Sequence, residues 1–257
     1  LPLYIGKSLL NKNYDVTFLS LNNKNRIFYN NYKVIDINIL SIKKILKALN
    51  SNNIKQIIFA GSIKRPGIKD LGFDFPTFKL AKNLLLEKKG DNSLLISLKN
   101  YLESKGFIFF NWTKHCSELF STESNLTNIK PSKKAILNLK KAKSIFQIYK
   151  KLDIGQAMII QNQLVLGLEA IEGTDELLRR CAAYKRKADN GILFKFSKKN
   201  QSNLIDIPLV GLDTIKNIKK FDYEGLVLER DKCLIVDKEK VIDYANKYNI
   251  FIKSEVF

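Results

Sequence analysis

Hydrophobic positions in the first 110 residues alternate between two patterns, those of buried strands and those of amphipathic helices. The predicted strands are 15–21, 54–60 and 107–110, and the predicted helices are 39–49, 78–89 and 92–104. Strands that alternate with helices of about 10 to 15 residues are typical of a parallel sheet with crossover connections. The pattern therefore predicts an α/β fold with an N-terminal Rossmann-like parallel-sheet domain.

A polar segment separates this part of the chain from the rest. Residues 120–132 have little apolar periodicity, are rich in Ser, Thr and Asn, and contain Pro131, which together predict a linker. We therefore expect an N-terminal α/β domain at residues 1–121, a linker at 122–132 and a second domain at 133–257.

The second half of the chain mixes hairpin and helix patterns. Apolar runs at 158–161 and 164–168 flank the turn residue Asn162 and predict one hairpin. The runs at 225–229 and 233–236 predict a second hairpin. The other predicted elements are helices at 133–150, 176–183, 214–220 and 238–248 and strands at 192–196 and 250–252. This order predicts a smaller, mixed α+β domain rather than a second doubly wound one.

The chain carries a formal charge of +19, which raises the question of an anionic partner. The excess is mostly lysine, dispersed through a chain also rich in Asn and Ile, as compositional drift would produce. Aromatic and basic residues do not alternate as a stacking platform requires, so we expect no nucleic-acid partner. A phospholipid surface or a nucleotide remains the alternative, and the basic helix at 133–150 is either a solvated face or a membrane-facing one. No run approaches the roughly 18 apolar residues of a membrane span.

The cysteines and the single histidine restrict the chemistry. Cys116, Cys181 and Cys233 are far apart and lack metal-ligand spacing, which indicates reduced packing residues in a cytoplasmic protein. His115 follows an aromatic run without a neighbouring ligand and is interpreted as a loop residue. A hydrolytic mechanism would therefore depend on carboxylates and a metal ion.

The segment EGTDELLRR at residues 172–180 has the pattern of an anion-binding helix start. Gly173 gives backbone freedom, and Thr174 or Asp175 is a good N-cap. Free N–H groups and the positive end of the helix dipole would then face a ligand, with Arg179–Arg180 as donors to phosphate oxygens. The alternative is an ordinary capped helix.

Carboxylates near this segment are candidate metal ligands. Glu169, Glu172 and Asp175 form an acidic cluster of the oxygen-ligand type that divalent cations prefer. Asp206 lies two residues before a proline and shortly before a predicted turn at Gly211. A carboxylate at such a strand end is well placed to bind Mg²⁺ or orient a water, and a turn-capping role is the alternative.

Two further groups suit a phosphorylated ligand. Lys195, on a predicted strand, would neutralise phosphate charge or serve as an ordinary edge-strand lysine. The segment AGSIKRP at residues 60–66 follows a buried strand, on the usual ligand side of a parallel sheet. The backbone of Gly61 and Ser62 and the side chain of Arg65 are therefore candidate nucleotide contacts. The sequence lacks a full dinucleotide-binding or Walker motif.

Four segments in this order resemble the motifs of the UDP-2,3-diacylglucosamine pyrophosphatase family of lipid A biosynthesis, the type with its own two-domain fold rather than the metallophosphoesterase type. They are residues 60–66, 152–156, 172–180 and 201–214. The resemblance covers essentially the whole chain and is strongest from Leu152 onwards.

The resemblance implies a cytoplasmic, Mg²⁺-dependent hydrolase that acts on a lipid-linked substrate, with peripheral contact to an anionic inner-membrane surface. It would split the diphosphate of UDP-2,3-diacylglucosamine into UMP and 2,3-diacylglucosamine 1-phosphate. The second domain would be the catalytic one, with Asp206 as catalytic carboxylate and metal ligand. The implied substrate contacts are Gly61, Ser62, Gln156, Gly173, Thr174 and Asp175.

The chain departs from the family pattern at three places, one of which is Leu204, where the family usually has a basic residue two positions before the catalytic aspartate. The family's opening strand and glycine-rich turn do not precede Leu1, so we expect them to be missing from this chain, and Ser62 replaces the family's asparagine. The alternative function is a nucleotide- or sugar-nucleotide-binding protein without hydrolytic activity, which UMP release would distinguish. A third interpretation, a nucleic-acid-binding module, rests on net charge alone.

Overall fold

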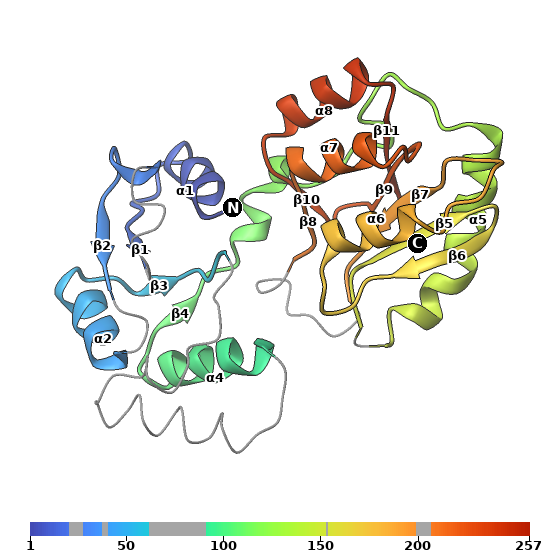
Figure 1. The fold of residues 1–257 in the computed structure, drawn as a ribbon. Coiled ribbons are helices and arrows are strands. Elements are labelled where there is room, and N and C mark those ends of the chain that lie inside the picture. The colour runs from blue at the N-terminus through green and yellow to red at the C-terminus, as the bar shows by residue number, and fades with distance from the viewer. Residues whose placement is uncertain (21–27, 38–40, 62–90, 153, 199–206) are drawn as a thin grey trace. The chain divides into compact units, whose positions relative to one another are not determined.

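The computed structural model describes residues 1–20, 28–37, 41–61, 91–152, 154–198 and 207–257. They fall into two compact units, Leu1–Cys116 and Ser117–Phe257 (Figure 1). Helices and strands mix in both units and most strand pairs are parallel, which confirms the predicted α/β class. The second unit, expected to be the smaller, is the longer of the two. The helix predicted at 78–89 lies outside the described residues.

The described residues of the first unit form two parallel strand pairs. Its elements are α1 (Pro2–Leu10), β1 (Phe18–Ser20), β2 (Val34–Asp36), α2 (Ile42–Ser51), β3 (Gln56–Ile57), α4 (Asp91–Ser104), β4 (Ile108–Phe109) and the 3₁₀ turn η3 (Trp112–Lys114). β1 pairs with β2 and β3 with β4, each in parallel, as a Rossmann-like domain requires. The sequence prediction missed α1 and β2. Pro2, in the first turn of α1, was the available signal, because proline is favoured there.

The second unit is built on one five-stranded sheet. Its elements are η4 (Ser117–Leu119), α5 (Lys133–Tyr149), β5 (Ala157–Gln161), β6 (Leu164–Leu168), α6 (Thr174–Ala182), β7 (Ile192–Lys195), β8 (Leu209–Val210), α7 (Leu212–Lys220), β9 (Gly225–Glu229), β10 (Leu234–Ile235), α8 (Lys238–Lys247) and β11 (Phe251–Glu255). The strand order is β11-β9-β7-β5-β6. β11, β9 and β7 are parallel, whereas β5 is antiparallel to β7 and β6.

Of the two predicted hairpins, the structure contains the first but not the second. β5 and β6 form the first one, with Asn162 and Gln163 both at positive φ in the turn. The second, at 225–236, is wrong. Asp231 does take a turn conformation, but β9 pairs in parallel with β7 and β11, and β10 pairs in parallel with β8. Because β9 is apolar on both faces, its sequence carried no signal that distinguishes a hairpin strand from a central parallel strand.

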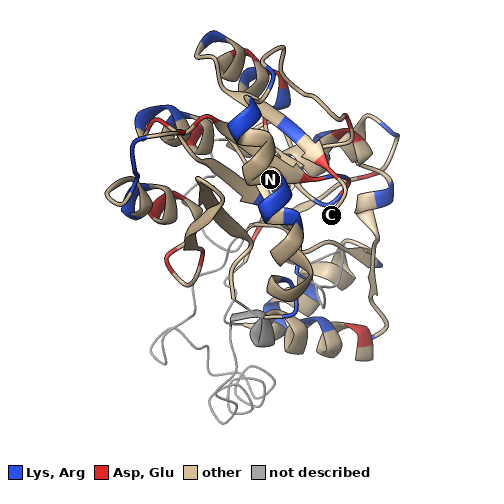
Figure 2. Ribbon diagram, turned by 90° about the vertical axis from the view of Figure 1, so that its right-hand side faces the viewer, with Lys and Arg blue, Asp and Glu red and all other residues tan. Residues whose placement is uncertain are grey.

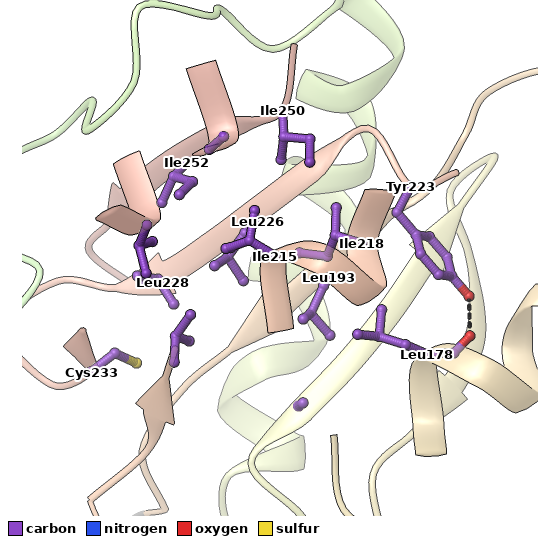
Figure 3. Packing of buried hydrophobic residues seen from close by; sticks show 14 of the residues in the cluster. Leu178, Leu193, Ile215, Ile218, Tyr223, Leu226, Leu228, Cys233, Ile250 and Ile252 are labelled. Atoms are coloured by element: carbon purple, nitrogen blue, oxygen red, sulfur yellow. Dashed lines mark hydrogen bonds between the residues drawn. The ribbon is translucent and has the colours of Figure 1, made fainter. Parts of the chain in front are cut away.

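Both faces of the three central strands of the five-stranded sheet, β9, β7 and β5, are buried, whereas Leu164 and Val165 of the edge strand β6 are exposed. Adjacent residues on one strand point to opposite faces, so Leu193 packs with α6, α7 and α8 while Phe194 packs with α5. Figure 3 shows the first of these layers, a cluster that includes Leu226 and Ile252 of the sheet and Ile215 of α7. The predicted basic helix α5 is thus a core layer whose Ala142 and Phe146 face the sheet. This double burial explains why the strands read as continuous apolar runs.

The segment after η4 runs alongside the last strand of the same unit. The Leu126 N–H donates to the Ile252 carbonyl at 3.0 Å, and the Ser254 N–H donates to the Ser124 carbonyl at 2.9 Å. Asn125 forms an isolated antiparallel bridge with Lys253. Residues 124–126 therefore lie beside β11, and the segment 122–132, predicted as a linker, falls within the second unit.

Basic side chains are spread widely over the molecule. Figure 2 shows Lys and Arg on many helices and loops rather than on a single element. Over the part of the chain that the structure describes, no helix combines the length and the apolar character needed to cross a bilayer.

Candidate functional site

One edge of the five-stranded sheet gathers three of the predicted site residues. Because β5 is antiparallel to both of its neighbours, its first residue lies beside the end of β7 and near the end of β6. Gln156 precedes β5, Lys195 ends β7, and Glu169 follows β6. Thr174, the first residue of α6, reaches the same edge.

These residues are joined by a chain of short hydrogen bonds. Lys195 Nζ donates to Thr174 Oγ1 at 2.7 Å, and Thr174 Oγ1 donates to Glu169 Oε1 at 2.6 Å. The other carboxylate oxygen, Glu169 Oε2, accepts the backbone N–H of Gln156 at 2.6 Å. The loop before β5, the end of β6, the start of α6 and the end of β7 are thereby fixed to one another. Three of the predicted substrate contacts, Gln156, Thr174 and Lys195, share this network, but Glu169 was not predicted as their common partner.

The charged members of this network are buried. Glu169 and Lys195 are each 8% exposed. The Tyr149 hydroxyl lies 3.5 Å from the Glu169 carbonyl and 3.4 Å from the Ala157 carbonyl. Burial, together with the negative charge of Glu169, raises the pKa of Tyr149 to about 12. The Thr174 hydroxyl bridges the buried lysine and the buried carboxylate, and this hydrogen-bonded chain leaves the lysine oriented.

Two glycines permit this arrangement, Gly155 by a close approach to its neighbour and Gly173 by its backbone conformation. A Cβ on Gly155 would lie 2.2 Å from the Glu169 carbonyl oxygen, so only glycine permits this close approach. Gly173 has φ +82° and is the N-cap of α6. The prediction of Thr174 or Asp175 as N-cap is therefore wrong by one or two positions, because the Thr174 hydroxyl bonds to Glu169 instead. α6 begins two residues earlier than predicted and points its N-terminus, the positive end of its dipole, towards this sheet edge.

The two arginines of α6 are paired within the chain. Arg180 donates to Glu172 Oε1 at 2.8 and 3.0 Å, and hydrogen bonds from the Glu172 backbone and from Arg180 hold the pKa of Glu172 below its ordinary value. Arg179 pairs with Glu176. Each arginine is therefore already in an ion pair, and this pair competes with the predicted binding of phosphate.

The predicted acidic cluster does not form a metal site from the residues whose positions are described. No group of three His, Cys, Asp or Glu side chains among them could hold a cation. Both oxygens of Glu169 accept hydrogen bonds, Glu172 pairs with Arg180, and Asp175 Oδ1 accepts a bond from Asn217 at 3.0 Å. These three carboxylates do not fit a divalent ion by themselves.

Asp206 lies outside the described residues, which resume at residue 207 just before β8. Cys233 Sγ donates to the Lys195 carbonyl at 3.3 Å, and the next N–H, from Leu234, donates to the Pro208 carbonyl at 2.8 Å. Pro208, two residues beyond Asp206, is thereby linked through β10 to the end of β7 that carries Lys195. Gly211, predicted to permit a tight turn, is extended at φ −133° and needs no glycine there.

The N-terminal candidates belong to the first unit. Gly61 follows β3 and has φ +99°, a conformation that favours glycine. A Cβ at this position would lie 3.4 Å from Pro2 Cγ. Ser62 and Arg65 lie outside the described residues, so their predicted substrate contacts stay predictions.

The remaining sulfur and imidazole groups behave as packing groups. Cys116, Cys181 and Cys233 are free and buried, as predicted. Burial raises the pKa of Cys233 to about 12, which makes it a poor nucleophile. His115 follows η3 as a loop residue, stacks on Phe110 and shares a 3.1 Å hydrogen bond with Tyr14.

Fold and site together define a two-unit α/β protein whose second unit orients a buried lysine at a helix start. The family model described as the LpxI N-terminal domain matches residues 1–119, and the model described as the LpxI C-terminal domain matches residues 122–253. The chain therefore belongs to the LpxI family, in agreement with the resemblance carried by the four motifs. It is 31% identical over 228 residues to the UDP-2,3-diacylglucosamine pyrophosphatase LpxI of Caulobacter vibrioides, over 86% of this chain and 81% of that protein.

Proposed function

We propose that this protein hydrolyses the diphosphate of UDP-2,3-diacylglucosamine to UMP and 2,3-diacylglucosamine 1-phosphate. The named activity of the Caulobacter relative and the match of both family models support the reaction. The structural observation that carries it is the oriented ammonium of Lys195 at the start of α6. An ammonium and a helix N-terminus together suit a ligand with adjacent phosphate groups.

In this proposal the residues of the chain have two roles, charge neutralisation and proton transfer. Lys195 and the N–H groups of the first turn of α6 neutralise the charge that develops on the diphosphate. Asp206 accepts a proton from the attacking water, which adds to one phosphorus while the anhydride P–O bond breaks. The family resemblance supports this role for Asp206, and the link from Pro208 to Lys195 through β10 is consistent with it.

We also propose that the reaction requires Mg²⁺, with Asp206 as the protein ligand. A bound Mg²⁺ would supply charge neutralisation on the diphosphate oxygens. One carboxylate together with substrate phosphates and waters is a common way of binding this ion, which fits a site where the neighbouring carboxylates are already hydrogen-bonded.

The proposed substrate carries two acyl chains, so we propose contact with an anionic membrane surface. Exposed aliphatic side chains lie on the two loops that meet at Gly155 and Glu169: Leu152 is 47% exposed, Ile154 40% and Ile171 fully exposed. Lys150 and Lys151 directly precede Leu152 in the sequence. Apolar tips beside basic residues are typical of interfacial binding. Ile171→Ser should weaken sedimentation with anionic vesicles, and unchanged sedimentation would contradict this part of the proposal.

UMP release from UDP-2,3-diacylglucosamine tests the reaction. The assay compares the protein with Asp206→Ala and with the matched control Asp213→Ala, whose side chain is 88% exposed. It is run with Mg²⁺ and with EDTA. We expect release that is lost with Asp206→Ala and with EDTA but kept with Asp213→Ala. A folded protein that binds the substrate without releasing UMP would favour a sugar-nucleotide-binding protein.

A further inference from the structure

Glu169 occupies a distinctive position beside the residues of the proposed reaction. It lies after the last residue of β6, is 8% exposed, and uses both carboxylate oxygens as acceptors. One acceptor bond fixes the hydroxyl proton of Thr174, and the other fixes the backbone of Gln156. Each bond is 2.6 Å, the short length of a charge-assisted hydrogen bond.

The direction of these bonds determines what Thr174 can do. A hydroxyl has one proton to donate, and Glu169 accepts it. Thr174 Oγ1 therefore acts as an acceptor towards Lys195, whose ammonium donates to it at 2.7 Å. An ammonium has three N–H groups, so one is fixed by Thr174 and the direction of the other two is fixed with it.

From this geometry we propose that Glu169 is a positioning residue, which acts through Thr174 to aim the Lys195 ammonium at the ligand's diphosphate. The proposal rests on the proposed function, because it needs a phosphate ligand at Lys195. It assigns Thr174 a different role from the predicted one: its hydroxyl orients the lysine rather than donating to the substrate. Glu169 itself need not touch the substrate.

A purely electrostatic role for Glu169 and a positioning role predict different effects of its removal on KM and kcat. A carboxylate near an anionic diphosphate repels it, so removal of that charge alone would tighten binding and lower KM. Loss of positioning instead lowers kcat, since the ammonium no longer meets the charge that develops in the transition state. In Glu169→Gln the amide keeps the shape, but its NH₂ group faces the Thr174 hydroxyl and releases the hydroxyl proton.

The test is a double-mutant cycle on UMP release. We expect Glu169→Gln and Thr174→Val each to lower kcat about tenfold to a hundredfold, the range for a lost hydrogen bond to a charged group. The double variant should be no worse than the poorer single variant, within about threefold, because both changes break one relay. Thr174→Ser, which keeps the hydroxyl, should retain most of the activity.

Glu224 offers a matched control. Its carboxylate also accepts one backbone N–H and one hydroxyl, both from Ser132, at 2.8 and 3.0 Å. Glu224→Gln should leave kcat within about twofold of the parent protein, since its hydrogen bonds lie outside the relay. Equal losses in Glu169→Gln and Glu224→Gln would mean that the effect is general destabilisation, and would overturn the proposal. Multiplicative losses in the double variant, or a lower KM with unchanged kcat in Glu169→Gln, would also overturn it.

A second readout separates this proposal from the proposed reaction. Calorimetric titration with UDP measures ligand binding without turnover, and Glu169→Gln and Thr174→Val should each weaken it, again without multiplying in the double variant. If the parent protein binds UDP but releases no UMP, the reaction is refuted and the positioning role is judged from binding alone. A parent protein that does neither overturns both.

Discussion

Replacing Gly155 by alanine should destabilise the second unit and loosen its site. The added Cβ would lie 2.2 Å from the Glu169 carbonyl oxygen and 2.5 Å from Glu169 Cβ, and both are atoms close to the main chain that cannot rotate away. The loop before β5 would have to retreat by about 1 Å, an overpacking that typically costs about 1–3 kcal/mol. Part of the hydrogen bond from the Gln156 N–H to the Glu169 carboxylate would be lost as well.

Together these effects give a loss of about 2–4 kcal/mol, which for a unit of this size lowers the melting temperature by roughly 5–15 °C. The assay is differential scanning calorimetry of the whole chain. The matched control is Gly211→Ala, because Gly211 has an extended backbone and a Cβ added there would meet nothing within 4 Å, so the melting temperature of this variant should stay close to that of the parent. Equal melting temperatures for the two variants would refute the reasoning.

Three further predictions concern other parts of the second unit. Because burial raises the pKa of Cys233 to about 12, its thiol should resist Ellman's reagent at about pH 8 until urea unfolds the chain, and rapid labelling of this residue in the folded protein would contradict its burial. Tyr223→Phe removes the hydroxyl that donates to the Leu178 carbonyl at 2.9 Å and should cost about 1 kcal/mol in urea unfolding, whereas Tyr184→Phe at an exposed position should cost almost nothing. Burial would raise the pKa of Glu255, but hydrogen bonds from two lysines outweigh it and lower that pKa. A depressed folded-state pKa gives stability that is present above the ordinary carboxyl pKa and lost as the pH falls below it, so the destabilisation by Glu255→Gln should shrink between about pH 6 and pH 3.

Local sequence signals predicted the elements of the second unit better than their pairing. The hairpin was predictable because Asn162, a residue that favours turns, lies between two apolar runs that are separated by only two residues. The strand 225–229 was also located, but its parallel neighbours were not, because a strand with two buried faces has the same composition in either direction. In the first unit, α1 was missed since its signal consists of little more than Pro2.

The sequence singled out Gln156, Thr174 and Lys195 one by one, but it did not predict that they share a hydrogen-bond network. The helix start at residues 173–175 and the strand end at Lys195 were recognisable from local pattern, and the structure joins Thr174 to Lys195 directly. Glu169 was interpreted as an acid that could bind a cation, because nothing in its neighbourhood in the sequence reveals that β5 brings Gln156 to it. A contact between strand ends depends on sheet order, which is a property of the whole unit rather than of any segment.

The pairing of residues 124–126 with β11 has a consequence for how the second unit is made. The partners of the Leu126 N–H and the Ser124 carbonyl are Ile252 and Ser254, almost at the end of the chain. During synthesis the opening segment of this unit must wait for its last strand to leave the ribosome, so the unit can complete its fold only once residues 251–255 have emerged. The same closeness of its two ends makes the unit a natural candidate for circular permutation, with a short loop joining them and new ends opened elsewhere on its surface.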